Sequence, residues 1–322
     1  MRWLLLLCLG CSTASLPALP KASGDTATFL VPGYKGSFLA DEQGERRWIT
    51  PSQALSSGDE SLALPGPRAL HPDGPVTRLS IFGIGETAYL PLLEFARDRL
   101  PGPVAFSYDW RQDVRESARR LCAAIAAAPV ARVDLVVHSM GGLVALHCLR
   151  QGALKVRRVA FLGTPFAGSA KISADLLRGD HALRNRALLS ADALFTFASS
   201  WQLLPPALPA ISVQTLGRPA ADEPQLARML AAHDGHWREL EGFVPAVPVL
   251  AVIGEGRSTP AALRFEDVEH LPQGDGDGLV TSASARPSFA HEEFRTKAEH
   301  SEMLGDRDVQ AALLRFLQGG PK

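Results

Sequence analysis

Short apolar runs alternate with longer amphipathic segments along most of the chain. The runs end in Gly, Pro or polar residues, as buried strands do, and the segments between them have the period of a helix. Strands that alternate with helices predict an α/β fold with a mostly parallel, doubly wound sheet. The predicted strands are 28–33, 76–83, 104–110, 133–137, the first part of 156–169, and 247–254. The predicted helices are 87–100, 115–128, 140–152 and 306–318.

Two long regions lack a regular pattern. Residues 36–75 are rich in Ser, Gly, Pro and Asp, and we expect an excursion with little regular structure. Residues 170–215 are mixed, helix-leaning and broken by prolines. The chain has 322 residues, of which 46% are hydrophobic, enough for one large catalytic domain over 29–318. The net charge of −1 gives no electrostatic reason to expect nucleic acid or an anionic membrane as a partner.

The stretch "VDLVVHSMGGLVALH" joins a predicted strand to a predicted helix at Ser139. Gly141 and Gly142 follow, so strand and helix can pass closely. This favours the nucleophile elbow of α/β hydrolases, in which a serine stands on a sharp turn above the sheet. The usual pattern is G-x-S-x-G, and here Val137 replaces the first glycine. A serine that merely caps the helix is the alternative.

A nucleophilic serine needs a base and an acid that orients it, and in this fold they follow in the order acid, then histidine. The Gly-rich stretch 273–284 holds Asp275 and Asp277 and is the expected acid loop, although such a stretch can also be a solvated turn. His291 and His300 lie downstream. We favour His300, which stands shortly before the last helix.

The oxyanion of the reaction needs two N–H donors. Met140, directly after the serine, is the first candidate. The loop "VPGYKGS" after the first strand offers the second, and Tyr34 is its first suitable donor past Pro32-Gly33.

The N-terminus is separate from the predicted fold. A short apolar stretch after Arg2 is typical of a signal peptide and is too short to span a bilayer. Leu9-Gly10-Cys11 resembles a bacterial lipoprotein cleavage box, which would make Cys11 the lipid-bearing first residue. We therefore expect a signal peptide over 1–10 and a tether over 11–28, with export to the cell envelope as a lipoprotein, or secretion, as the alternatives.

Four cysteines show no zinc spacing: Cys8, Cys11, Cys122 and Cys148. Cys122 and Cys148 fall on apolar faces of predicted helices. We expect buried free thiols there, and a disulfide between the two is the alternative.

Six motifs together resemble the lecithin–cholesterol acyltransferase family, which includes phospholipid–diacylglycerol acyltransferases and lysosomal phospholipase A2. The similarity extends over about 29–315. Aligning the acid loop on Val280 indicates Asp277 rather than Asp275 as the catalytic acid. The motifs are "FLVPGYKGSFLA", "FSYDWRQD", "VVHSMGG", "FLGTPFAGS", "GDGDGLV" and "EHSEML".

The resemblance implies an α/β-hydrolase fold and transfer of an acyl chain from a lipid ester, a phospholipid above all, to an alcohol or water. The triad would be Ser139, Asp277 and His300, and no metal or organic cofactor is required. We expect a monomer that reaches the membrane through its lipid anchor. A general esterase or lipase, or a non-catalytic lipid-anchored protein, are the alternatives.

Three features stay open. Residues 40–75 contain no cysteine and few large apolar residues, unlike the family's aromatic-rich, disulfide-closed lipid-docking loop. Residues 170–215 match the family's lid, and their apolar part either covers the site or packs on the core. Asp109 and Arg111 are expected to support the site or bind substrate, and a purely structural ion pair is the alternative.

Overall fold

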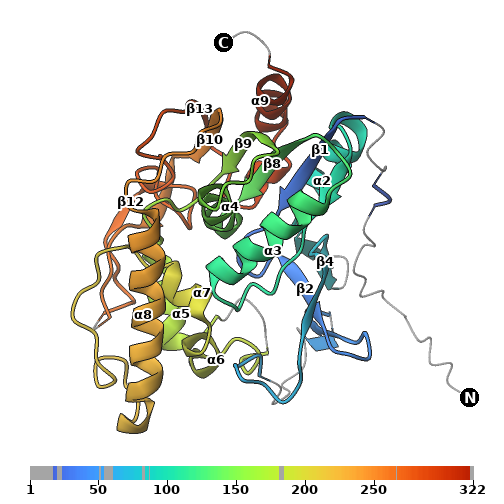
Figure 1. Cartoon of the computed structure of the whole chain (residues 1–322). Coiled ribbons are helices and arrows are strands. Elements are labelled where there is room, and N and C mark those ends of the chain that lie inside the picture. The colour runs from blue at the N-terminus through green and yellow to red at the C-terminus, as the bar shows by residue number, and fades with distance from the viewer. Residues whose placement is uncertain are drawn as a thin grey trace, which may run out of the picture.

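The structure is a computed structural model, which describes residues 17–19, 24–50, 52–53, 61–81, 84–86, 88–180, 185–265 and 267–319. A six-stranded sheet crosses the molecule, and helices cover both faces (Figure 1). All neighbouring strands are parallel, in the order β13-β10-β9-β8-β1-β7. The predicted doubly wound parallel sheet is therefore confirmed.

The sheet consists of β1 (Thr26–Val31), β7 (Pro103–Ala105), β8 (Arg132–His138), β9 (Val156–Leu162), β10 (Val249–Gly254) and β13 (Glu292–Thr296). The helices are α2 (Leu90–Arg99), α3 (Val114–Ala127), α4 (Met140–Arg150), α5 (Lys171–Arg178), α6 (Ala191–Phe195), α7 (Ala198–Gln202), α8 (Glu223–Leu240) and α9 (Arg307–Gln318).

Alternate residues of the central strands enter two separate hydrophobic cores. Leu135 and Val137 of β8 belong to the core that also contains residues of α3 and α4. Val136 belongs to the core under α2 and α9. Successive side chains of a strand point to opposite faces, so the buried run of β8 fills both cores at once. The loops after β1, β8, β10 and β13 leave the same, carboxyl edge of the sheet, where ligands of open α/β sheets bind.

The expectation of little regular structure over 36–75 is wrong. β2 (Ser37–Ala40), β3 (Arg46–Trp48) and β4 (His71–Pro75) form an antiparallel sheet in the order β3-β2-β4. Each strand is too short to leave a clear period-2 pattern. The Trp48 indole holds this sheet to the main fold, because its Nε1–H donates to the Lys35 carbonyl at 3.0 Å.

The strand predicted over 76–83 does not join the main sheet. Its described part contains β5 (Leu79–Ile81), which pairs antiparallel with β6 (Ile84–Glu86). An apolar run indicates a strand but not its partner. The strand predicted over 104–110 ends at Ala105. The chain continues as a loop that bonds to the segment between β1 and β2.

α8 and β13 are among the elements that were not predicted from the sequence. The buried positions of α8 are Leu226, Met229, His233 and His236, so two histidines interrupt its apolar stripe. β13 is an edge strand with a largely polar sequence, EEFRT. Hydrophobic periodicity is weak in both cases for these reasons.

Cys122 of α3 and Cys148 of α4 form a disulfide, with Cα atoms 5.4 Å apart. The expectation of free thiols is therefore wrong. The two helices pack side by side, which brings the two cysteines within bonding reach.

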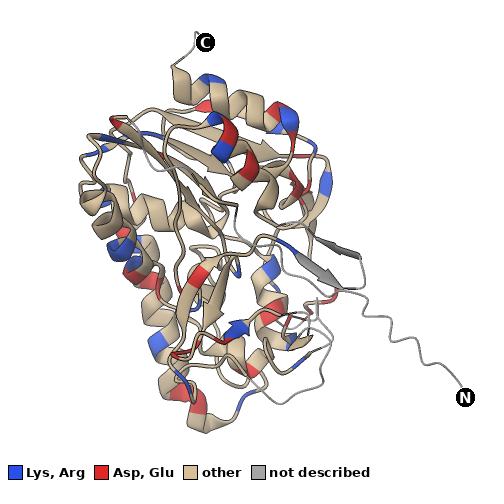
Figure 2. Cartoon of the chain, turned by 90° about the vertical axis from the view of Figure 1, so that its right-hand side faces the viewer, with Lys and Arg blue, Asp and Glu red and all other residues tan. Residues whose placement is uncertain are grey.

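The predicted signal peptide, Cys11 and most of the tether lie outside the described residues. No helix in the described part of the chain is long and apolar enough to cross a membrane. Basic and acidic residues are intermixed along the elements coloured in Figure 2, in keeping with the near-zero net charge.

Candidate active site

Ser139 is the residue between β8 and α4. Its backbone has φ 54° and ψ −129°, a conformation that residues other than glycine rarely adopt. Its N–H donates to the Leu162 carbonyl at 2.9 Å, and its side chain makes no capping hydrogen bond to α4. The geometry is that of a nucleophile elbow, and the helix-cap alternative lacks its defining contact.

Three glycines allow the backbone to close around this serine. A Cβ atom on Gly33 would lie 2.7 Å from the Ser139 Cβ, and one on Gly141 would lie 2.5 Å from the Pro32 carbonyl oxygen. A Cβ on Gly142 would lie 2.1 Å from the Thr164 Oγ1. The loop after β1 can therefore rest on the elbow only because Gly33 and Gly141 have no side chain, and Thr164 after β9 can approach it only because Gly142 has none.

Asp277 and His300 form a buried pair at the same edge of the sheet. Their Oδ2 and Nδ1 atoms are 2.7 Å apart, and the residues are 1% and 7% exposed. The other carboxylate oxygen accepts the N–H groups of Leu279 at 2.9 Å and Val280 at 2.7 Å. Burial raises the pKa of the Asp277 carboxyl, but His300 and these N–H groups outweigh it and hold the pKa below its usual value.

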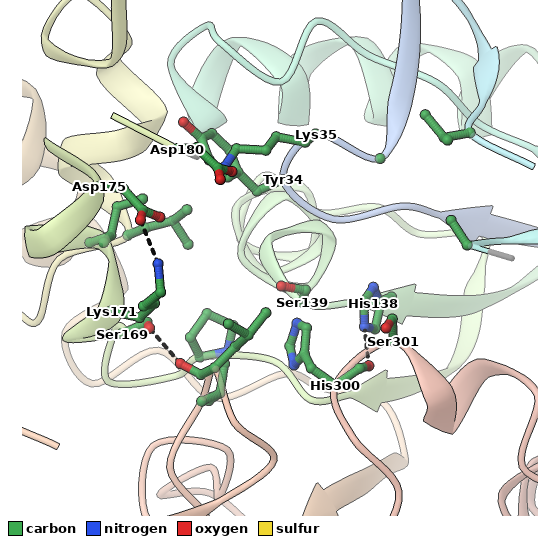
Figure 3. A pocket seen from close by; sticks show the side chains of 18 of the residues that line it. Tyr34, Lys35, His138, Ser139, Ser169, Lys171, Asp175, Asp180, His300 and Ser301 are labelled. Carbon is green, nitrogen blue, oxygen red and sulfur yellow. Dashed lines mark hydrogen bonds and ion pairs between the residues drawn. The ribbon is translucent and has the colours of Figure 1, made fainter. Parts of the chain in front are cut away.

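An ionised Asp277 can only accept, so His300 carries its proton on Nδ1 and leaves Nε2 free to act as a base. Figure 3 shows the His300 ring beside the Ser139 side chain, both facing one cavity. The structure thus brings together the three residues expected to form the triad.

The rejected acid and histidine have other partners. Asp275 accepts the Gly256 N–H at 2.6 Å and the Ser282 hydroxyl at 2.8 Å, within the hairpin of β11 (Arg257–Pro260) and β12 (Gln273–Gly276). His291 Nδ1 bonds to the Phe289 carbonyl at 2.7 Å. Neither residue contacts the pair of Asp277 and His300.

The two expected oxyanion donors adjoin the serine. Gly33 N–H already donates to the Tyr89 hydroxyl at 2.7 Å, which leaves Tyr34 as the next donor of the loop. Tyr34 lines the same cavity as Ser139. Met140 N–H belongs to the first turn of α4, whose N–H groups have no acceptor within the helix.

A cavity of about 480 Å³ opens over Ser139 (Figure 3). Two ion pairs stand in its wall: Lys35 with Asp180, and Lys171 with Asp175. The apolar part of the wall includes Val76, Ala88, Pro165, Ile172, Leu203 and Leu279. An apolar pocket with a few charged groups beside a nucleophile suits an amphipathic ester.

Asp109 and Arg111 do not line the cavity. The guanidinium forms two hydrogen bonds to the carboxylate, at 2.9 and 2.8 Å, and a third to the Leu62 carbonyl at 3.1 Å. The expected substrate-binding role finds no support in these contacts, which are those of a structural ion pair. Their neighbours reach the site instead: Tyr108 donates to the Pro32 carbonyl at 2.8 Å, and Trp110 to the Ser37 carbonyl at 3.0 Å.

The apolar part of the expected lid packs inward. Phe195, Phe197 and Trp201 are at most 3% exposed, and the Phe197 ring lies 5.7 Å from that of Trp110. These side chains belong to the core, which was the alternative to a cover over the site. The segment still borders the cavity, through residues of α5 and through Leu203.

Tyr89 and His138 are site residues that the sequence analysis missed, as it did the charged residues of the cavity wall. His138 Nδ1 lies 2.7 Å from the Tyr89 hydroxyl, and its Nε2 lies 3.0 Å from the His300 carbonyl. Burial and the nearby His300 lower the pKa of His138 to about 3, so its ring is neutral. The one available signal was a histidine at the very end of a buried strand.

The family model described as lecithin:cholesterol acyltransferase matches residues 99–222. That segment contains the "FSYDWRQD" motif and the elbow, but neither Asp277 nor His300. A curated relative is the uncharacterized protein YJR098C of Saccharomyces cerevisiae, 26% identical over 193 residues. The match covers 55% of this chain and 28% of that protein, so the chain corresponds to under a third of the relative's length.

A chain of the Tle4–Tli4 complex has a TM-score of 0.58 to this structure at 14% identity, over 92% of this chain and 98% of that one. The mature lipase BlEst2 of Bacillus licheniformis has a TM-score of 0.45 at 15% identity, over 94% and 96%. At 14% identity the likeness to the chain of the Tle4–Tli4 complex concerns the fold alone. The resemblance to the lecithin–cholesterol acyltransferase family is thus confirmed over residues 99–222, on an α/β-hydrolase fold.

Proposed function

We propose that this protein is a serine-dependent enzyme that transfers a fatty acyl chain from a lipid ester to an alcohol or to water. One observation carries the proposal. Ser139, with the backbone of a nucleophile elbow, shares a cavity with His300, whose Nδ1 is held by the buried carboxylate of Asp277. Nucleophile, base and orienting acid are the parts that acyl transfer through a covalent intermediate needs.

In the first step the Ser139 oxygen attacks the ester carbonyl while the His300 Nε2 takes its proton. The N–H groups of Tyr34 and Met140 stabilise the negative charge on the carbonyl oxygen, and Asp277 stabilises the imidazolium. The carbon–oxygen bond of the ester then breaks, and His300 returns the proton to the leaving alcohol. An acyl group remains on Ser139 until a second alcohol or water removes it by the reverse steps.

The cavity supports a lipid ester as the donor. Its apolar wall suits an acyl chain, and its ion pairs offer both signs of charge to a polar headgroup. The resemblance over residues 99–222 favours a phospholipid. We propose a monomeric enzyme, since the reaction described here needs no group from a second subunit.

Product analysis distinguishes transfer from hydrolysis. The protein would be incubated with phospholipid vesicles, with and without a long-chain alcohol, and the lipids separated. A transferase yields the new ester when alcohol is present, whereas a hydrolase yields free fatty acid in both cases. Turnover of soluble short-chain esters with no product from phospholipid would favour the general esterase instead, and no turnover of any ester would favour a non-catalytic protein.

We also propose that the protein is exported and anchored through Cys11. The Leu9-Gly10-Cys11 box motivates this, and the Cys122–Cys148 disulfide supports export, because disulfides persist mainly in oxidising compartments. The several acyl chains of a lipoprotein would hold the domain at the membrane. Mass spectrometry of the mature N-terminus tests the anchor: a lipidated Cys11 is expected, and an unmodified N-terminus beyond Cys11 contradicts it.

A further inference from the structure

A continuous chain of hydrogen bonds joins the loop after β1 to the segment that carries His300. The Gly33 N–H donates to the Tyr89 hydroxyl at 2.7 Å. That hydroxyl lies 2.7 Å from His138 Nδ1, and His138 Nε2 lies 3.0 Å from the His300 carbonyl oxygen. Tyr89, His138 and His300 are 7%, 6% and 7% exposed, so little water can compete for these bonds.

The two ends of this series of hydrogen bonds, together with the neutral His138 ring, determine which atom donates in each bond. A backbone N–H only donates, so the Tyr89 oxygen accepts from Gly33. A carbonyl only accepts, so His138 Nε2 carries a proton and donates to His300. The neutral His138 ring then has an acceptor at Nδ1, and the Tyr89 hydroxyl donates its one proton there. All three bonds are satisfied by a single arrangement of protons.

Each end of the chain adjoins a group of the proposed mechanism. Gly33 precedes Tyr34, the proposed oxyanion donor. It packs directly against Ser139, which is possible only because glycine has no Cβ. His138 is the residue before Ser139, and its ring lies 4.7 Å from that of His300. The backbone of His300 is also tied on its other side, where its N–H donates to the Asp277 carbonyl at 3.1 Å.

We propose that Tyr89 and His138 are a positioning relay, which holds the oxyanion loop and the His300 segment in register around Ser139. This inference rests on the proposed function, because it concerns the geometry of that same acyl transfer. Neither side chain transfers a proton to substrate in this scheme. The relay acts through the main chain at both ends, so its loss misplaces the oxyanion donor and the base together.

Tyr89→Phe tests the relay, because it removes one hydroxyl and keeps the ring that packs beside His138. We expect kcat for ester turnover to fall about 10- to 100-fold, since a misplacement of about 1 Å can cost that much, while KM changes less than about twofold. Ser117→Ala is the matched control: it also removes a buried hydroxyl, at a position of α3 that does not line the cavity. It should leave kcat unchanged.

The double variant shows whether Tyr89 acts through His138. His138→Gln puts a polar amide in place of the imidazole; the amide cannot bond at both positions of the ring nitrogens, so the series of three bonds is broken. If the relay is one unit, adding Tyr89→Phe to His138→Gln should lower kcat by less than about threefold, whereas independent effects would multiply. Melting temperatures of all variants, measured in the same buffer, ensure that folded enzymes are compared.

The results separate this inference from the function beneath it. Suppose that the wild-type protein turns over esters. An unchanged kcat in Tyr89→Phe, or effects that multiply in the double variant, would then overturn the relay and leave the proposed function standing. A wild-type protein that neither turns over esters nor reacts with a fluorophosphonate overturns both. A reduced kcat at unchanged KM, with the smaller loss in the double variant, supports the relay.

Discussion

The backbone of Ser139 lies in a conformation that an L-residue rarely adopts, and its neighbours keep it there. Gly33 and Gly141 allow the loop after β1 to press on the elbow, and the Leu162 carbonyl accepts the serine N–H. Strain of this kind costs on the order of 1–3 kcal/mol and persists only where packing over-determines it. The strained backbone places the Ser139 hydroxyl in the cavity, beside His300.

The choice between two neighbouring aspartates is a prediction at this scale. Asp277→Asn should lower kcat about 10⁴-fold, because an amide at this position favours the wrong tautomer of His300. Asp275→Asn is the matched control, since it makes the same change two residues away in a carboxylate bonded to Gly256 and Ser282. Steady-state kinetics measure kcat of both variants. A large loss of kcat in Asp275→Asn with a nearly unchanged kcat in Asp277→Asn would reverse the assignment.

At the scale of elements, the sequence predicted what lies in the centre and missed what lies at the edge. β8 and β9 lie in the centre of the sheet and each ends in a buried, mostly apolar run, so their existence and the elbow between β8 and α4 could be inferred. The edge strand β13 is mostly polar, and α8 buries two histidines in its stripe, so neither has a clear pattern. The strands β2–β4 are too short for a clear pattern, and β2 finds one of its two partners, β4, only after a long intervening segment.

Some residues of the site could likewise be predicted from the sequence, and others could not. Ser139, Asp277 and His300 stand in motifs that could be read along the chain. The relay could not be inferred, because Tyr89 and His138 are 49 residues apart and meet only when α2 packs beside the end of β8. The Asp109–Arg111 pair is the opposite case: a distinctive motif suggested support of the site or substrate binding, whereas its contacts, to each other and to the Leu62 carbonyl, are those of the structural alternative.

The bond between α3 and α4 gives a prediction for these elements. Replacing both Cys122 and Cys148 with alanine should lower the free energy of unfolding by about 3–4 kcal/mol, because the bridge closes a loop with a sequence separation of 26 residues. Urea denaturation with and without reductant measures it. Reductant should destabilise the parent and leave the double variant unchanged; equal stability of parent and double variant in non-reducing buffer would contradict the bond.

For the whole molecule, a buried pair of histidines links α4 to α8 away from the cavity. His147 Nε2 lies 2.8 Å from His236 Nδ1. Burial lowers the pKa of His147 to about 4, with Glu239 acting in the opposite direction, and burial and His147 hold the pKa of His236 well below its usual value. The folded protein therefore keeps both rings neutral at a pH where the unfolded chain binds protons.

The sign of the effect follows from these lowered pKa values. As pH falls below about 6.5, histidines of the unfolded chain gain protons before His147 does, so stability is full above that pH and is lost toward pH 4. His147 alone accounts for about 3 kcal/mol over this range. Urea denaturation of His147→Gln from pH 7 to 4.5 should show a smaller loss than the parent.

His71→Gln is the control for that comparison, because His71 is exposed at the start of β4. It should retain the pH dependence of the parent. A parent whose stability does not change between pH 7 and 4.5, or a His147→Gln variant that loses as much as the parent, would contradict the assignment of acid sensitivity to this pair.

The central claim for the molecule is that the fold activates one serine among many. Reaction with a fluorophosphonate, followed by peptide mass spectrometry, tests it most directly, because the reagent modifies a serine only where base and oxyanion donors make it nucleophilic. We predict one adduct, on Ser139, which disappears in Ser139→Ala and in wild-type protein unfolded before labelling. No adduct on the folded wild-type protein, or an adduct on a different serine, would contradict the claim.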